Sequence, residues 1–199
     1  MESMDNPLHD KGSALFTSIT MEAVTKSLWS KFVERGKVVF IPRGQHLSNL
    51  QNQHYCYYIL EGSCGVFLQT EEGKTLCLEL FMENEYFHDR LFNTDNFSFP
   101  TETIAIEDLI VMRISKVDFN TLKCPETGVL LSVLYDQHCL KKLQFRQIEM
   151  LTKTAEVRYQ ELLVHFPHIV KRIPLFIVAS YLGITIQSLS RIRANLSKK

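Results

Sequence analysis

The 199-residue sequence predicts an α+β fold in which a strand-rich N-terminal part is followed by helices. Three observations support this prediction. Short apolar runs separated by turns occupy residues 35–116, a stretch without proline runs from 127 to 151, and the last 26 residues have the pattern of a helix-turn-helix. A chain of this length can hold a domain of about 120 residues and a small second module.

The apolar runs of the N-terminal part predict short strands. Six of them are rich in β-branched or aromatic residues and end at turn residues: 37–45, 55–62, 64–70, 74–80, 103–106 and 109–114. A hairpin turn is indicated at residues 71–73, where two glutamates precede a glycine, and another turn at Glu107 and Asp108. Short strands at this spacing are typical of a barrel or a sandwich.

A long helix is predicted after the strands, because Pro125 and Glu126 suit a helix start and no proline follows up to Leu151. Twenty-five helical residues span roughly 37 Å. The number of large apolar side chains favours pairing of two subunits along this helix; the alternative is packing within one subunit. Five side chains fall roughly on one stripe along the predicted helix: Leu130, Leu134, Lys141, Ile148 and Leu151. Three more lie beside this stripe: Val133, Leu140 and Phe145.

The C-terminal segment predicts two short helices joined by a tight turn. Pro174 suits a first helical turn, Gly183 suits the left-handed residue that ends a helix, and Thr185 can cap the next helix. Residues 155–163 predict a preceding helix, and 165–173 a connection. The inward apolar positions are Ile177, Val178, Tyr181, Leu182, Leu189, Ile192 and Leu196. The outward donors are Gln187, Ser188, Arg191 and Arg193, which suit base edges and phosphates.

Charge is distributed unevenly along a chain that is neutral as a whole, with 22 basic and 22 acidic residues. Residues 141–199 hold 11 basic and 3 acidic residues, a balance of +8, so residues 1–140 balance at −8. This asymmetry indicates a basic end that faces a polyanion and an acidic body. The alternative interpretation of the C-terminal pattern is an amphipathic helical hairpin with solvated charges.

Three segments carry a resemblance to a known family: 40–44 (FIPRG), 57–62 (YYILEG) and the C-terminal 179–185 (ASYLGIT) with 189–193 (LSRIR). The chain resembles the Crp/Fnr transcription regulators over about residues 15–199, and most of all the branch common in Bacteroidetes-type bacteria. The resemblance implies an α+β fold with an N-terminal double-stranded β-helix, a jelly-roll-like β-roll, as sensor domain. A long dimerisation helix and a C-terminal all-α helix-turn-helix domain would follow.

The resemblance implies a sensor domain at 1–125, a dimerisation helix at 126–153 and a DNA-binding domain at 154–199. Many relatives continue into a β-hairpin wing, whereas this sequence ends at Lys199, so we expect no wing and a greater dependence on dimerisation. Double-stranded DNA, a second copy of the chain and RNA polymerase are the implied partners. The base-reading positions of the family fall on Ile186, Gln187 and Arg191, and Thr185, Ser188 and Arg193 are assigned to phosphates.

The effector pocket departs from the pattern of family members that bind cyclic nucleotides. His88 stands where the family has glycine, Asp89 where it has glutamate, and Pro100 where it has the arginine that pairs with the cyclic phosphate. Proline offers neither charge nor donor to a phosphate, which argues against cyclic AMP or GMP. The candidate pocket residues are His88, Asp89, Arg90 and Thr101. They predict either a different small-molecule effector or a pocket that is closed.

Other function classes find little support in the sequence. The five cysteines (Cys56, Cys64, Cys77, Cys124 and Cys139) include no closely spaced pair for an iron–sulfur site, and we predict no metal. Their odd number and the absence of a secretion signal favour the cytoplasm. His54, or His165 with His168, offers only weak metal-binding signals. No phosphate loop, nucleophile elbow or zinc-protease motif indicates an enzyme, and no 18-residue apolar run indicates a membrane span.

Two alternatives to a DNA-binding regulator remain at this stage. The first is a ligand-binding module whose C-terminus contacts protein rather than DNA. The second is an interaction scaffold whose sensor has lost its ligand. Retardation of random DNA would separate the first from a regulator, and stabilisation by a metabolite would exclude the second.

Overall fold

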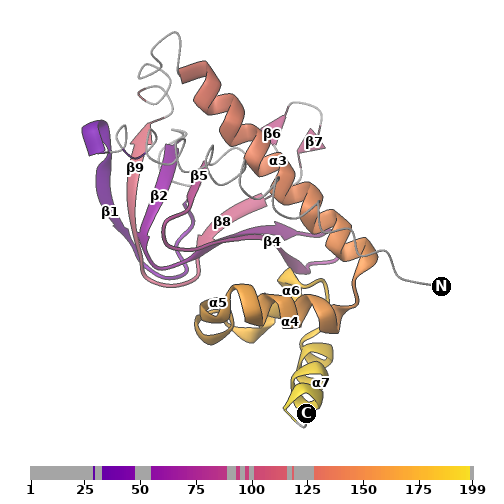
Figure 1. Ribbon diagram of the computed structural model, residues 1–199. Coiled ribbons are helices and arrows are strands. Elements are labelled where there is room, and N and C mark those ends of the chain that lie inside the picture. Colours follow the sequence, from indigo (N-terminus) through magenta and orange to yellow (C-terminus); the bar gives the residue numbers. More distant parts are fainter. Residues whose placement is uncertain are drawn as a thin grey trace, which may run out of the picture.

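The computed structural model describes residues 29, 33–47, 55–88, 93–94, 97–98, 101–115, 118 and 128–197. Two antiparallel sheets form the N-terminal part, and the helices follow (Figure 1). The strands and helices occur in the order that the sequence predicts, so the predicted α+β class with a jelly-roll-like strand domain is confirmed.

The larger sheet has four strands in the order β1 (Lys37–Ile41), β9 (Leu109–Ser115), β2 (Tyr55–Glu61) and β5 (Tyr86–His88). The second sheet has three, in the order β4 (Thr75–Phe81), β3 (Cys64–Gln69) and β8 (Thr101–Ala105). A short ribbon pairs β6 (Asn93–Thr94) with β7 (Phe97–Ser98). We call residues 37–115 the β domain. Strands β5, β6 and β7 are the ones that sequence analysis missed.

The core of the β domain lies between the two sheets, where alternate side chains of the larger sheet point inward. Ile59 of β2 and Leu109 and Val111 of β9 are fully buried, and Val66 of β3 meets them from the other sheet. The period-two burial follows from the pleat of a strand, which sends successive side chains to opposite faces. The apolar runs that predicted these strands therefore contribute to one shared interior.

Five helices complete the described chain. The long helix α3 spans Gly128–Thr152, and α4 (Ala155–His165), α5 (Pro167–Arg172), α6 (Leu175–Tyr181) and α7 (Ile186–Leu196) follow it. We call residues 155–196 the C-terminal module. The segment 165–173 connects α4 to α6, as predicted, and contains the short helix α5, which the sequence analysis did not identify. Residues 125–127, where the predicted boundary of the sensor domain falls, lie outside the described residues.

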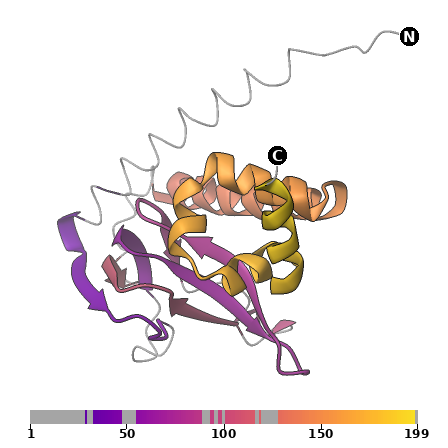
Figure 2. The same ribbon diagram turned by 90° about the horizontal axis from the view of Figure 1, so that it is seen from below.

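The C-terminal module shares a hydrophobic core with the β domain. Phe67 of β3 and Leu80 of β4 belong to the same buried cluster as Ile177, Val178 and Leu189 of the module. Figures 1 and 2 show α6 directly against β4, with the other short helices around it. The packing of the module is therefore set by the sheet surface that β4 offers.

Among the described residues, no single helix is long and apolar enough to cross a membrane. The helices α6 and α7 satisfy the length and composition criteria only when taken together, and they meet at a bend of 99°.

The turn between β2 and β3 depends on Gly62. Its φ of 93° lies in the left-handed region, and a Cβ at this position would overlap the backbone carbonyl oxygen of Asp108. Gly44 also has a positive φ, 81°, but a Cβ there would meet no atom within 4 Å. An alanine at position 44 would therefore add backbone strain alone, whereas an alanine at position 62 would add both backbone strain and a steric clash.

We predict that Gly44→Ala lowers the unfolding free energy by about 1–2 kcal/mol, because only left-handed strain is added. Gly62→Ala should cost distinctly more, since the turn at Asp108 must also move. Urea unfolding of both variants measures the difference. Equal losses would show that the contact between the two turns is unimportant.

Candidate nucleic-acid interface

The helix α7 begins with a side-chain cap. The hydroxyl of Thr185 accepts a hydrogen bond from the backbone N–H of Ser188 at 3.2 Å, and the two hydroxyls lie 3.0 Å apart. A threonine cap satisfies one of the backbone donors left free at a helix start. The predicted cap is confirmed, so the first turn of α7, which carries the predicted reading residues Ile186 and Gln187, is held in helical geometry.

The turn between α6 and α7 is fixed from two sides. Gly183 has a φ of 69°, as the sequence predicted, and a Cβ there would lie 2.5 Å from Cε of Met150 at the end of α3. Arg158 of α4 donates from Nη2 to the carbonyl oxygen of Leu182 at 2.9 Å. A helix-turn-helix requires a fixed angle between its two helices, and these contacts come from outside both of them.

The inner face of α7 is apolar and packed. Leu189 is buried, and Ile192 and Leu196 pack against the cluster that includes Tyr159 and Leu162 of α4. The predicted inward positions are confirmed. This packing turns the opposite face of the helix to solvent.

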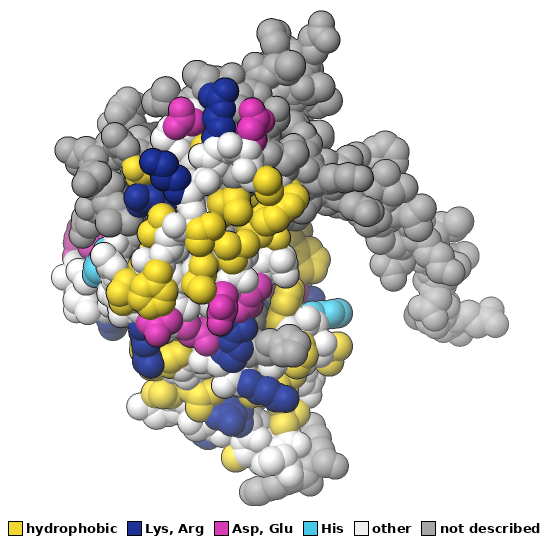
Figure 3. All heavy atoms as spheres, turned by 90° about the vertical axis from the view of Figure 1, so that its left-hand side faces the viewer, with side chains coloured by type: hydrophobic (Ala, Val, Ile, Leu, Met, Phe, Trp, Pro, Cys, Tyr) yellow, Lys and Arg dark blue, Asp and Glu magenta, His cyan; other side chains and the backbone are white. Residues whose placement is uncertain are grey.

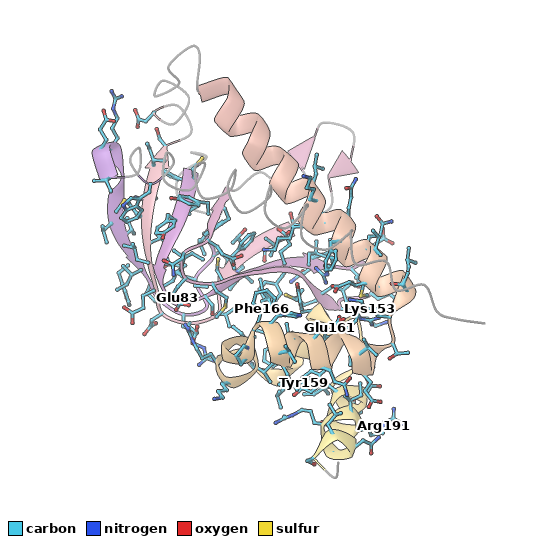
Figure 4. All side chains as sticks on the ribbon, viewed as in Figure 1. Glu83, Lys153, Tyr159, Glu161, Phe166 and Arg191 are labelled. Carbon is cyan, nitrogen blue, oxygen red and sulfur yellow. The ribbon has the colours of Figure 1, made fainter. Side chains whose placement is uncertain are left out.

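The outer face carries the predicted donors. Gln187 and Arg191 are exposed, and the Arg191 guanidinium lies 3.4 Å from the hydroxyl of Ser188. Ile186 is 42% exposed and precedes them on the first turn. Figure 4 shows Arg191 on α7, at the end of the molecule remote from the four-stranded sheet. No part of the described β domain covers this face.

The two arginines of α7 face different directions. Arg191 and Arg193 are about 160° apart around the helix axis. Arg193 lies at a shallow surface hollow of about 560 Å³ together with Tyr159 and Leu163 of α4. Arg193 therefore does not share the outward face with Arg191, although the sequence analysis placed both on that face.

Much of the basic charge at the C-terminal end is used inside the protein. Lys142 pairs with Glu85, Lys153 pairs with Glu149 and Glu161, and Arg172 pairs with two glutamates of the β domain. Arg146 and Arg158 donate to backbone carbonyl oxygens. Five of the eleven basic residues thus have internal partners. The sequence interpretation, in which the whole end faces a polyanion, assigned too much charge to that role.

Most of the predicted effector pocket cannot be placed. Asp89 and Arg90, like Pro100, lie outside the described residues, and His88 is described only by its backbone at the end of β5, opposite Cys56. Thr101 begins β8 opposite Leu68 and is partly buried.

Directly before His88, the interior of the β domain is filled with aromatic rings. Phe87 stacks on Tyr57 with 4.8 Å between ring centroids and on Phe81 with 5.0 Å, and all three rings are buried. Sequence analysis missed this stack because the three residues are 6 to 30 positions apart and lie on three different strands. The available signal was the presence of aromatic residues at inward strand positions.

Three cysteines can be placed, Cys56, Cys64 and Cys77, and all three are buried. Burial raises the pKa of the Cys64 thiol, and it raises that of Cys77 to about 12. Both thiols are therefore protonated at neutral pH, whereas a metal ligand or a reactive cysteine must be a thiolate. No cluster of three potential ligands occurs among the described residues. His54, Cys124 and the side chains of Cys139 and His168 lie outside them.

Residues 33–123 match the family model of the cyclic nucleotide-binding domain. A comparison with curated protein sequences gives no match. Among solved structures, FixK2 from Bradyrhizobium japonicum is similar at 14% identity and a TM-score of 0.66, over 82% of this chain and 85% of that chain. The c-di-GMP responsive global regulator CLP of Xanthomonas campestris is similar at 14% identity and a TM-score of 0.62, over 87% and 92%. A CooA variant from Carboxydothermus hydrogenoformans is similar at 17% identity and a TM-score of 0.58, over 82% of this chain and 77% of that chain.

Each of these similarities covers more than four fifths of this chain. The identities are low, so the solved structures establish the fold. Residues 33–123 are therefore similar to a cyclic nucleotide-binding domain, and the chain has the fold of FixK2 and CLP.

Proposed function

We propose that the protein is a DNA-binding transcription regulator, that it acts as a homodimer on a palindromic operator, and that its β domain does not bind cyclic AMP. The observation that supports this most directly is α7, a capped helix whose exposed face presents Gln187 and Arg191. Helices of this kind enter the major groove of DNA, where each base pair shows a distinct pattern of donors and acceptors.

The contacts on DNA are assigned by side-chain chemistry. An arginine fork fits O6 and N7 of guanine, so Arg191 is the main reader of sequence. Gln187 suits adenine, and Ile186 suits the methyl group of thymine. Thr185, Ser188 and Arg193 contribute phosphate contacts, which fix the position of the helix and add affinity without sequence preference. Selection of bound sites from random DNA tests this assignment and the operator symmetry together.

Dimerisation is supported by the inverted polarity of α3. The side of the helix that packs on the rest of the subunit carries the charged residues Lys142 and Arg146. Three large apolar residues point outward instead: Leu140 is 58% exposed, Ile148 56% and Leu151 78%. A surface helix of a monomer has the opposite arrangement, with its apolar stripe toward the core.

A two-fold dimer through α3 also suits the DNA. Paired recognition helices reach two half-sites that lie about 34 Å apart, one helical turn of the duplex. Phosphate contacts double in the dimer, which offsets the small number of basic residues that α7 offers. RNA polymerase is the further partner that this role requires.

The proposal that cyclic AMP is not bound depends on the stretch 87–103. Pro100 replaces the arginine that would pair with the cyclic phosphate, and without it a buried phosphate lacks its strongest partner. The stacked rings of Tyr57, Phe81 and Phe87 also occupy the interior beside this stretch. The match to the cyclic nucleotide-binding model thus describes the domain and leaves its ligand open.

We predict that Arg191→Ala relaxes sequence choice at one base pair of each half-site and costs roughly 1–3 kcal/mol on the preferred site. Arg193→Ala is the matched control, because it removes the same charge from the opposite side of α7. It should weaken binding to all sequences alike and reduce the salt dependence of affinity. Site selection with both variants, followed by binding measurements at two salt concentrations, distinguishes the roles. An unchanged selected sequence with Arg191→Ala would refute its role.

We predict that Leu151→Asp converts the protein to a monomer. Burial of a leucine side chain contributes about 2 kcal/mol, and a two-fold interface contains it twice, so the dissociation constant should rise roughly a thousandfold. Sedimentation equilibrium measures this. Val164→Asp is the control, because Val164 is 73% exposed on α4, outside α3. If the two variants behave alike, the outward face of α3 is not the interface.

We predict that 1 mM cyclic AMP does not raise the melting temperature. A ligand at 100 times its dissociation constant adds about 2.7 kcal/mol of stability, so even binding at about 10 μM would be visible. Thermal unfolding with cyclic AMP, and with adenosine as a control, makes the measurement. A saturable increase with cyclic AMP alone would disprove this part of the proposal.

A further inference from the structure

Arg172, the last residue of α5, reaches across to the β domain and binds two carboxylates at once. Its Nη1 and Nη2 donate to Glu83 at 3.0 and 2.7 Å, and its Nε and Nη2 donate to Glu107 at 3.1 and 2.7 Å. Each glutamate is therefore held by a fork of two hydrogen bonds, the strongest geometry that a guanidinium offers. We call these three residues the Arg172 clamp.

Both carboxylates are held in place by the turns that carry them. Glu83, between β4 and β5, also accepts a hydrogen bond from the backbone N–H of Gly62 at 2.9 Å. Glu107, between β8 and β9, accepts one from the hydroxyl of Ser63 at 2.6 Å. Figure 4 shows Glu83 at the turns of the strands, beside α5. The two carboxylates are thus already ordered within the β domain. The conformational entropy lost when the clamp forms is therefore mainly that of the Arg172 side chain.

Within the clamp, Glu83 is ionised at neutral pH. Partial burial acts to raise the pKa of Glu83, but hydrogen bonds from Arg172 and from backbone N–H groups lower it overall. A lowered carboxyl pKa means that the contribution of Glu83 to stability is complete above its unfolded pKa and is lost as the pH falls through the lowered folded value. Figure 3 shows the meeting of acidic and basic side chains along this edge of the sheet.

The position of the clamp connects it to the helix-turn-helix. Ile173, the next residue, is 3% exposed in the core shared by the module and the β domain, and α6 starts at Leu175. At the other end of α6, the hydroxyl of Ser180 accepts a hydrogen bond from the N–H of Cys77 in β4 at 2.8 Å. The first helix of the helix-turn-helix is therefore attached to the β domain at both ends.

We propose that Arg172 is a positioning residue that holds the C-terminal module on the β domain of its own subunit and does not contact DNA. By fixing α6 on β4, the clamp fixes the direction in which α7 projects from the subunit. The part of this inference that concerns DNA affinity depends on the proposed function. The attachment of the module to the β domain does not.

Cys77 provides a direct measure of this attachment. Its side chain is 2% exposed and lies in the shared core, so a thiol reagent reaches it only when the module leaves β4. Cys64 is fully buried in the separate core of the β domain and reports global unfolding. Reaction of the full chain with a maleimide, followed by peptide mapping, gives both rates in one experiment.

With Arg172→Met, we expect labelling of Cys77 to accelerate by at least about tenfold while labelling of Cys64 stays unchanged, because two charge-assisted forks are lost and only local opening follows. Glu83→Gln should accelerate it less. Lys171→Met is the matched control: it removes the same charge one residue earlier, at an exposed position, and should leave both rates unchanged. Equal Cys77 rates for Arg172→Met and Lys171→Met would overturn the proposal, as would a parallel rise at Cys64.

DNA binding supplies a second readout. On the selected site, Arg172→Met should raise the dissociation constant yet leave the slope of log affinity against log salt unchanged, since no phosphate contact is lost. A reduced slope would place Arg172 on the DNA and refute the positioning role. If the unmodified protein binds no DNA, the proposed function fails, and the labelling result still decides whether the clamp holds the module.

Discussion

The packing of α6 on β4 is the constraint on which the rest of this structure depends. The described C-terminal module has about forty residues, too few to bury a sufficient core by itself. Its buried residues Ile177, Val178 and Leu189 are completed by Phe67 and Leu80 of the β domain. The cap of α7 and the glycine turn before it determine the local geometry of the helix-turn-helix. Packing on the sheet determines the position of the module within the subunit.

This dependence explains the charge pattern of the chain. An acidic N-terminal part and a basic C-terminal part attract each other, and the structure joins them through Lys142 with Glu85 and Arg172 with Glu83 and Glu107. The same basic residues are then not available for phosphates. In the proposed regulator, affinity for DNA comes from a few exposed cations, of which Arg191 and Arg193 lie on α7, and from the two copies of that helix in a dimer.

Local patterns made much of the fold predictable. Glycines at turns marked the strand ends, and the cap at Thr185 and the turn at Gly183 marked the helix-turn-helix, because these features depend on neighbouring residues alone. Helix α5 was missed since six residues are too few for a periodic pattern. The clamp could not be predicted, because Arg172 lies 65 and 89 positions from its partners and only the folded β domain brings Glu83 and Glu107 together. The aromatic stack of Tyr57, Phe81 and Phe87 could not be predicted for the same reason, because only the folded sheets bring its three strands together.

The long helix connects these observations. Its charged side is used to bind the β domain and α6, where Arg146 donates to the carbonyl oxygens of Cys77 and Tyr181 and lies over the Tyr181 ring. Its apolar side is left exposed at Leu140, Ile148 and Leu151. In the proposed dimer, the α3 helix of a second subunit covers this exposed apolar side. Under that proposal, pairing through α3 and attachment through α6 together determine where the two copies of α7 stand, so the spacing of the half-sites is set by contacts within the protein.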